Sequence, residues 1–175
     1  MRRLTDAERL RAFLQALARA TDTVCRLYLT GGGTAVLYGW RPTTIDVDVK
    51  LVPESDAVLR AIANLKDELQ INVELASPAD FIPELPGWED RSVFVMQEGK
   101  LAVFHYDLYA QALAKIERGH AQDVADVEVM LSRELVERAK LLDLFGRIEP
   151  ALYRYPALDP RTFRRAVEDA IGVVP

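Results

Sequence analysis

The sequence predicts an α+β protein (α/β in the loose sense), in which a small mixed sheet is flanked by helices and followed by a helical C-terminal part. Two observations support this. Between residues 42 and 107, short segments alternate apolar and polar residues, which is typical of strands. Before residue 21, and again from Leu108 on, apolar residues recur at the spacing of amphipathic helices. We therefore expect residues 1–107 to form the core and residues 108–175 a helical subdomain packed on it.

Composition predicts a cytoplasmic protein without membrane association. Half of the 175 residues are hydrophobic and 28% are charged, as in ordinary soluble domains. No apolar run reaches the roughly 18 residues that a membrane span needs, and the first residues lack the apolar core of a signal peptide. The lone Cys25 excludes an internal disulfide and a cysteine-based zinc cluster.

The net charge of −5 is concentrated in the middle of the chain. Residues 42–107 contain five basic and thirteen acidic residues, whereas residues 1–41 contain seven basic and three acidic ones. Sequence-blind nucleic-acid binding depends on neutralising phosphates, so an acidic middle argues against it. The same acidic middle suits a site that attracts cations.

The first element is a predicted helix over residues 5–20, with Thr5 and Glu8 as a capping box at its start. Strands are expected at "CRLYLT", "IDVDVKLV" and "INVELAS", and a helix from about Glu54 to Glu68. In the last two strands, the residues expected to face inward are Val47, Val49, Leu51, Ile71, Val73 and Leu75.

A proline-punctuated loop, "SPADFIPELPGWEDR", separates these strands from a predicted hairpin that turns at Glu98-Gly99. The remaining chain is expected to be helical. Its predicted helices cover residues near 108–118, 121–132, 134–146 and 160–171.

Asp46 and Asp48 lie two positions apart on a predicted strand, so both side chains leave from the same face. Carboxylates about 5 Å apart repel by roughly 3 kcal/mol at an effective dielectric of 20. A divalent cation would cancel this repulsion, and Mg²⁺ commonly uses one or two carboxylates together with substrate phosphates. A solvated polar strand face is the alternative explanation of an isolated Asp-x-Asp.

The glycines 31–33 follow a predicted strand and precede a short helix. The free N–H groups of a first helical turn favour phosphate, and glycine lets phosphate approach the backbone. A tight turn without a ligand is the alternative. The pattern is neither the dinucleotide-binding G-x-G-x-x-G nor a P-loop, because no Gly-Lys-Ser/Thr follows.

The combination of strand, Gly-Gly, short helix and Asp-x-Asp resembles the signature of the DNA polymerase β-type nucleotidyltransferases. Gly32-Gly33 and Asp46-Val47-Asp48 match it in spacing. "GGTAVLYGWRPTTIDVDV" is most similar to the minimal enzymes of the abortive-infection (AbiEii-like) type, toxins of some bacterial toxin–antitoxin pairs. A second block, "ALAKIERGHAQDVADVEVML", resembles their later motifs, with Lys115 and then Asp123 and Asp126.

The resemblance implies transfer of a nucleoside monophosphate from a nucleoside triphosphate (NTP) to an acceptor, with two Mg²⁺ ions. Asp46 and Asp48 would ligate both ions, and Glu74 is the candidate third acid, with Asp107 as fallback. Nucleotide contacts are implied for Gly32, Gly33, Thr34, Arg41, Thr44 and Lys115. Asp123 or Asp126 would orient or deprotonate the acceptor.

The implied acceptor is tRNA or a protein, and the implied partner is a cognate antitoxin. Two alternatives stay open: an aminoglycoside acceptor, which the acidic middle suits equally well, and a catalytically inactive nucleotide-binding or interaction protein with the same fold. Residues also considered for the site are Trp40, Trp88, Arg91 and His120.

Overall fold

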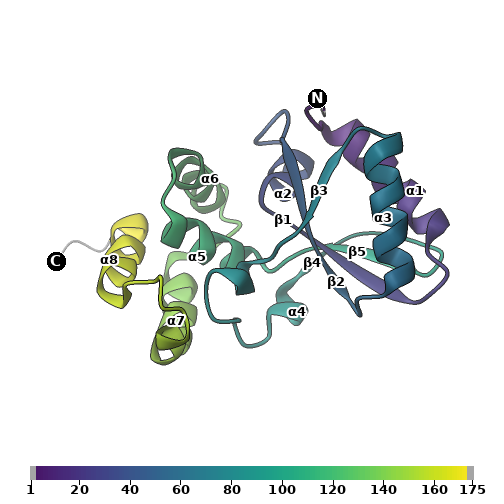
Figure 1. The fold of residues 1–175 in the computed structure, drawn as a ribbon. Coiled ribbons are helices and arrows are strands. Elements are labelled where there is room, and N and C mark those ends of the chain that lie inside the picture. Colours follow the sequence, from purple (N-terminus) through teal and green to yellow (C-terminus); the bar gives the residue numbers. More distant parts are fainter. Residues whose placement is uncertain (1–2, 173–175) are drawn as a thin grey trace. The chain divides into compact units, whose positions relative to one another are not determined.

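Within residues 3–172, which the computed structural model describes, five strands form one mixed sheet in the order β3-β2-β1-β5-β4 (Figure 1). Strands β1 and β2 are antiparallel, as are β4 and β5, whereas β1–β5 and β2–β3 are parallel. The strands are β1 (Cys25–Thr30), β2 (Asp46–Val52), β3 (Asn72–Leu75), β4 (Val93–Glu98) and β5 (Leu101–His105). The α+β prediction and the hairpin are confirmed.

The chain divides into two compact units. The first, which we call the sheet unit, comprises the chain up to Ser77 together with Ser92–Tyr106. The second, the helical unit, comprises Pro78–Arg91 and the chain from Asp107 on. The proline-punctuated loop thus groups with the helices that follow the sheet.

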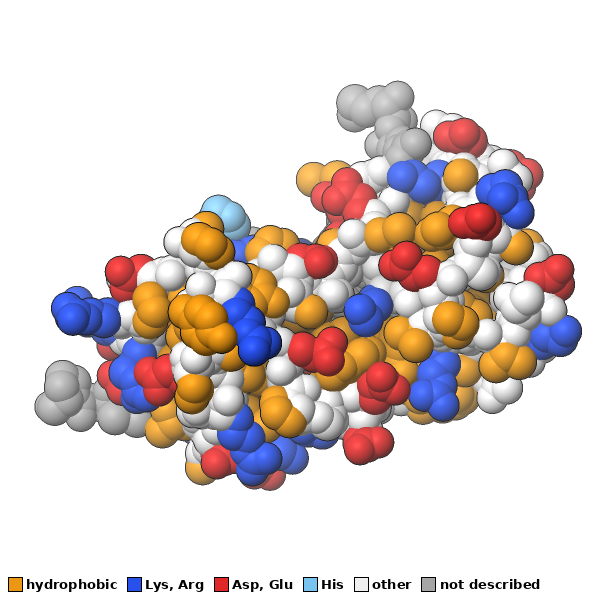
Figure 2. Space-filling view, turned by 60° about the horizontal axis from the view of Figure 1, so that its bottom comes forward, with side chains coloured by type: hydrophobic (Ala, Val, Ile, Leu, Met, Phe, Trp, Pro, Cys, Tyr) orange, Lys and Arg blue, Asp and Glu red, His pale blue; other side chains and the backbone are white. Residues whose placement is uncertain are grey.

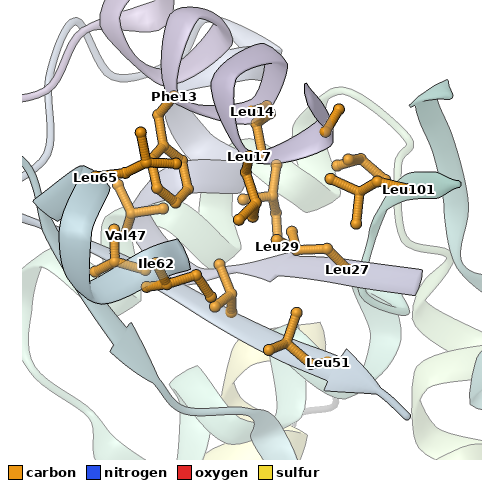
Figure 3. Packing of buried hydrophobic residues seen from close by; sticks show 14 of the residues in the cluster. Phe13, Leu14, Leu17, Leu27, Leu29, Val47, Leu51, Ile62, Leu65 and Leu101 are labelled. Atoms are coloured by element: carbon orange, nitrogen blue, oxygen red, sulfur yellow. The ribbon is translucent and has the colours of Figure 1, made fainter. Parts of the chain in front are cut away.

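Three helices belong to the sheet unit: α1 (Ala7–Ala20), α2 (Gly31–Tyr38) and α3 (Asp56–Glu68). Phe13, Leu14 and Leu17 of α1 point toward the sheet, where they meet apolar side chains of β1, β2 and β5 (Figure 3). Val47, Val49 and other inward residues of β2 are at most 3% exposed, as the alternation predicts. The same alternation leaves the polar residues of β2 half-buried on the opposite face.

Two details of the sheet unit differ from the sequence prediction. Helix α1 is capped by Asp6, whose carboxylate accepts the Arg9 N–H at 2.9 Å, so the predicted Thr5 capping box is wrong. Thr5 instead forms an isolated β-bridge with Thr44. Leu75 was expected to face inward but is 52% exposed, because it ends an edge strand.

The helical unit contains α5 (Leu108–Arg118), α6 (Ala121–Ser132), α7 (Arg138–Ile148) and α8 (Pro160–Ile171). Shorter helical segments are η1 (Pro78–Asp80), α4 (Trp88–Arg91) and η2 (Glu149–Arg154). The predicted helix near 134–146 begins four residues later, because Glu134 has a φ of +56° that a helix does not accommodate. Phe145 of α7 and Phe163 of α8 pack edge to face, with ring centroids 5.0 Å apart.

The surface mixes both charge signs with isolated apolar side chains (Figure 2). Among residues 3–172, none of the helices combines the length and apolar character that crossing a membrane requires.

Candidate functional site

Asp46 and Asp48 lie half-buried on the polar face of β2. Asp48 pairs with Thr30 of β1 on one side and with Glu74 of β3 on the other. Asp46 pairs with Asn72 of β3. Five polar positions of three adjacent strands therefore share one face of the sheet at the end of β1 where α2 begins.

Gly31 brings the start of α2 next to Asp48. A Cβ atom at position 31 would lie 2.7 Å from Asp48 Oδ2, closer than any side chain tolerates, and Gly31 has a φ of +55°. The left-handed backbone favours glycine here, whereas the short contact is with the end of a flexible side chain that can turn. Gly31 is the first residue of α2, so the N-terminal turn of this helix begins beside a carboxylate.

Gly32 is required for a different reason. A Cβ there would lie 2.0 Å from the Oγ1 atom of Thr44. That hydroxyl donates to the Asp46 carbonyl oxygen at 2.9 Å, and the Thr44 backbone exchanges two hydrogen bonds with Thr5. Thr44, predicted to contact nucleotide, thus joins the glycine turn to the first residue of β2. Gly33, by contrast, has only ordinary van der Waals neighbours.

We expect Gly31→Ala to destabilise the protein by about 1–2 kcal/mol from its left-handed backbone alone, and Gly32→Ala by about 1–3 kcal/mol from overpacking against Thr44. The matched control is Gly146→Ala, on an exposed turn of α7 with open space around the added methyl. That substitution should stabilise by about 0.5–1 kcal/mol. Urea unfolding of the three variants checks this, and equal midpoints for all three would contradict the packing described.

Asn72 links two acids of the face. Its Nδ2 donates to Oδ1 of Asp46 and, at 3.2 Å, to Oε1 of Glu74. Glu74 is exposed, and its assignment as third acid stays a prediction. Across residues 3–172, no three or more His, Cys, Asp and Glu side chains are grouped so as to hold a metal ion by themselves. Asn72 is not among the residues predicted for the site, because its pairing depends on the β2–β3 register, which no local pattern contains.

Thr34 and His105 form a buried pair behind the glycine turn. The Thr34 hydroxyl donates to the Leu29 carbonyl at 3.2 Å, and it lies 3.1 Å from His105 Nδ1. Because the hydroxyl hydrogen is used, His105 Nδ1 is the donor of this second bond. Thr34, predicted to offer its hydroxyl to nucleotide, is 1% exposed and directs that hydroxyl into the fold. Its predicted contact with nucleotide stays a prediction.

Burial and the nearby Arg11 lower the pKa of His105 from 6.5 to about 4, so the ring is neutral at pH 7. The ring of Tyr38 packs against it, with centroids 4.6 Å apart. Tyr38 in turn packs on Trp40 at 5.5 Å. These three aromatic side chains thus pack together at the C-terminal end of α2.

Stability should fall as the pH drops from about 6.5 toward 4. The unfolded chain takes up a proton on His105 near pH 6.5, whereas the folded protein resists it until about pH 4. The expected loss is about 2 kcal/mol between pH 7 and pH 5. His105→Gln should remove this part of the pH dependence, and His120→Gln, at the exposed cap of α6, should not. Identical pH slopes for both variants in urea unfolding would contradict the assignment.

Arg41 and Trp40 follow the end of α2, which closes at Gly39 in the left-handed conformation. Their backbone N–H groups donate to the Ala35 carbonyl at 3.3 and 3.1 Å. Both side chains are half-buried. The predicted contact of Arg41 with nucleotide stays a prediction.

Lys115, Asp123 and Asp126 come together in the helical unit as a buried ionic cluster. Lys115 Nζ lies 2.6 Å from Asp126 Oδ2 and 3.4 Å from Asp123 Oδ1. Arg118 Nη2 lies 2.6 Å from the same Asp123 oxygen, and Gln122 donates to Asp126 Oδ1 at 3.4 Å. Lys115 is 4% exposed and joins α5 to α6 through these contacts. Its predicted contact with nucleotide stays a prediction.

Asp107, the fallback third acid, is completely buried. Its Oδ1 accepts the Tyr109 N–H at 3.0 Å and thereby caps α5. Its Oδ2 accepts both Nε and Nη2 of Arg91, at 3.0 and 2.7 Å. Trp88 is also buried, so this stretch of the proline-punctuated loop is anchored within the helical unit.

The donor set of the sheet unit fits a Mg²⁺ ion that is shared with a phosphate ligand. Asp46 and Asp48 supply one or two carboxylates on one face, which is the usual protein contribution to such an ion. The start of α2 lies beside Asp48, and the first turn of a helix is a favourable place for phosphate. A cation at the two carboxylates would thus lie beside the start of α2 in the same unit.

Comparisons with known proteins identify one family. A family model described as "Nucleotidyltransferase of unknown function (DUF6036)" matches residues 7–164. No curated protein and no solved structure matches the chain.

Proposed function

Because the chain belongs to this family of nucleotidyltransferases, we propose that it moves a nucleoside monophosphate from an NTP to an acceptor, with Mg²⁺ held by Asp46 and Asp48. The observation that carries the proposal is the adjacency of Gly31 and Asp48, where an added Cβ would lie 2.7 Å from the carboxylate oxygen. This adjacency supports the proposal, because one triphosphate is long enough to reach both the glycine turn and the two carboxylates.

In the proposed reaction an acceptor oxygen forms a bond to the α-phosphorus, the bond from that phosphorus to the bridging oxygen breaks, and pyrophosphate leaves. The acceptor hydroxyl releases its proton to solvent. Bound Mg²⁺ would supply charge neutralisation for the phosphates. The residues of the chain hold the reactants: Asp46 and Asp48 bind the cation, and the N–H groups of residues 31–33 bind phosphate oxygens. Thr44 keeps the turn and the carboxylates in register.

The acceptor is proposed to be one that a toxin-like nucleotidyltransferase would use, and this part of the proposal rests on the sequence resemblance. The likeness of residues 32–49 to the abortive-infection type favours tRNA or a protein as acceptor, and a cognate antitoxin as partner. An aminoglycoside is tested beside them, because the middle of the chain carries a net charge of −8.

The test uses each NTP labelled at the α-phosphate, with Mg²⁺ and one acceptor at a time: total tRNA, cellular protein or an aminoglycoside. We expect label on one acceptor from a preferred NTP, and none when EDTA is present. Calorimetry with each NTP accompanies the assay. Nucleotide binding without any transfer would indicate an inactive nucleotide-binding protein. The absence of both binding and transfer would contradict the proposal.

A further inference from the structure

The Asn72 side chain lies between two carboxylates that belong to different strands. Its Nδ2 carries two hydrogens, and it donates to Asp46 Oδ1 and to Glu74 Oε1, the second at 3.2 Å. The arrangement follows from the parallel register of β2 and β3, which places Asn72 directly beside Asp46 and Glu74 beside Asp48. An amide donor thus occupies the centre of the acidic face.

An asparagine at position 72, in place of an acid, limits the negative charge on this face of the sheet. Each added carboxylate about 5 Å from another costs roughly 3 kcal/mol at an effective dielectric of 20. An amide adds no charge, and Asn72 donates to both neighbouring carboxylates. Asn72 therefore joins Asp46 and Glu74 without adding another negative charge to this face.

The Asn72 amide also affects the orientation of the Asp46 carboxylate. A carboxylate that turns freely presents its oxygens in many directions, whereas one held by a hydrogen bond presents its second oxygen in one direction. Oδ1 of Asp46 is held by Asn72, so Oδ2 is directed by that contact. Residues that orient metal-ligating carboxylates in this way typically contribute 10–100-fold to metal affinity.

We propose that Asn72 is a positioning residue, which orients Asp46 for binding of a divalent cation. The inference rests on the proposed function, in which Asp46 binds that cation. It assigns to Asn72 no contact with the cation or with the nucleotide. The class of ligand it serves is a hard divalent cation such as Mg²⁺ or Mn²⁺.

The test is a titration of the full chain with Mn²⁺ alone, followed by the electron paramagnetic resonance signal of free Mn²⁺. Asn72→Ala removes the donor, and Asn72→Leu removes it while keeping nearly the same shape. The matched control is Asn64→Ala, the same substitution at an exposed position of α3 in the same unit. Asp46→Asn reports on the cation site itself. Urea unfolding without metal accompanies each variant.

We expect both Asn72 variants to bind Mn²⁺ 10–100-fold more weakly than the unsubstituted protein. Asn64→Ala should bind normally, and Asp46→Asn should lose binding. If the Asn72 variant that stays folded binds as tightly as the unsubstituted protein while Asp46→Asn does not, the positioning role is wrong and the proposed function stands. If the unsubstituted protein and Asp46→Asn bind Mn²⁺ equally, the proposed cation site fails, and the role of Asn72 fails with it.

Discussion

Asp48→Asn is expected to lower the rate of nucleotidyl transfer by about 10³-fold or more, which corresponds to about 4 kcal/mol of transition-state stabilisation. Asp48 lies beside the first residue of α2, so its charge acts at the point where the triphosphate would meet the cation. The substitution keeps the size and shape of the side chain while removing the charge, and we therefore expect the fold to persist.

The same substitution should abolish the thermal shift produced by Mg²⁺ and NTP together. A ligand present at 100 times its Kd stabilises a protein by about 2.7 kcal/mol, so the shift is easily measured. Asp46→Asn should behave in the same way. The matched control is Asp169→Asn, at an exposed position of α8, which should retain both transfer and shift. Undiminished transfer by Asp48→Asn would remove this carboxylate from the mechanism.

Lys115→Ala is expected to destabilise the protein by about 3–5 kcal/mol, because it leaves buried Asp126 without its cation. Asp123 retains Arg118, so the loss falls mainly on Asp126, whose Oδ1 still accepts a hydrogen bond from the Gln122 amide. Lys66→Ala, on the half-buried side of α3, should change stability by no more than about 0.5 kcal/mol.

A structural role for Lys115 has a second consequence. Replacing the pair together, with Lys115→Met and Asp126→Leu, should recover most of the stability, since well-packed apolar residues substitute for a buried ion pair at little cost. Urea unfolding of the single and double variants measures this recovery. If Lys115→Ala unfolds like the unsubstituted protein and loses only transfer, Lys115 serves the substrate, as the sequence resemblance implies.

The two faces of β2 could be predicted because a local pattern determines them, whereas the nearness of the glycine turn to the aspartates was implied only by the family resemblance. Strict alternation places Val47 and Val49 in the core, and the same alternation necessarily puts Asp46 and Asp48 on the other face. Because β1 and β2 are antiparallel, the end of β1, where the glycines follow, lies near the start of β2. Thr30 accordingly pairs with Asp48.

The features that could not be predicted depend on contacts between distant segments. Thr5 fits a capping box locally, but it pairs with Thr44 across the sheet unit, and Asp6 takes over the cap. The environment of Lys115 depends on how α5 packs against α6, which places an acid from the next helix on its ammonium group. Asn72 acquires its partners only through the register of β2 and β3. Sequence periodicity contains none of these pairings.

The central claim is that two carboxylates and a glycine turn hold one cation–triphosphate complex. A crystal structure with Mg²⁺ and a non-hydrolysable NTP tests it most directly. We expect Mg²⁺ in contact with Asp46 and Asp48, and phosphate oxygens accepting N–H groups from residues 31–33. Nucleotide bound elsewhere on the protein, with both carboxylates facing only solvent, would contradict the claim.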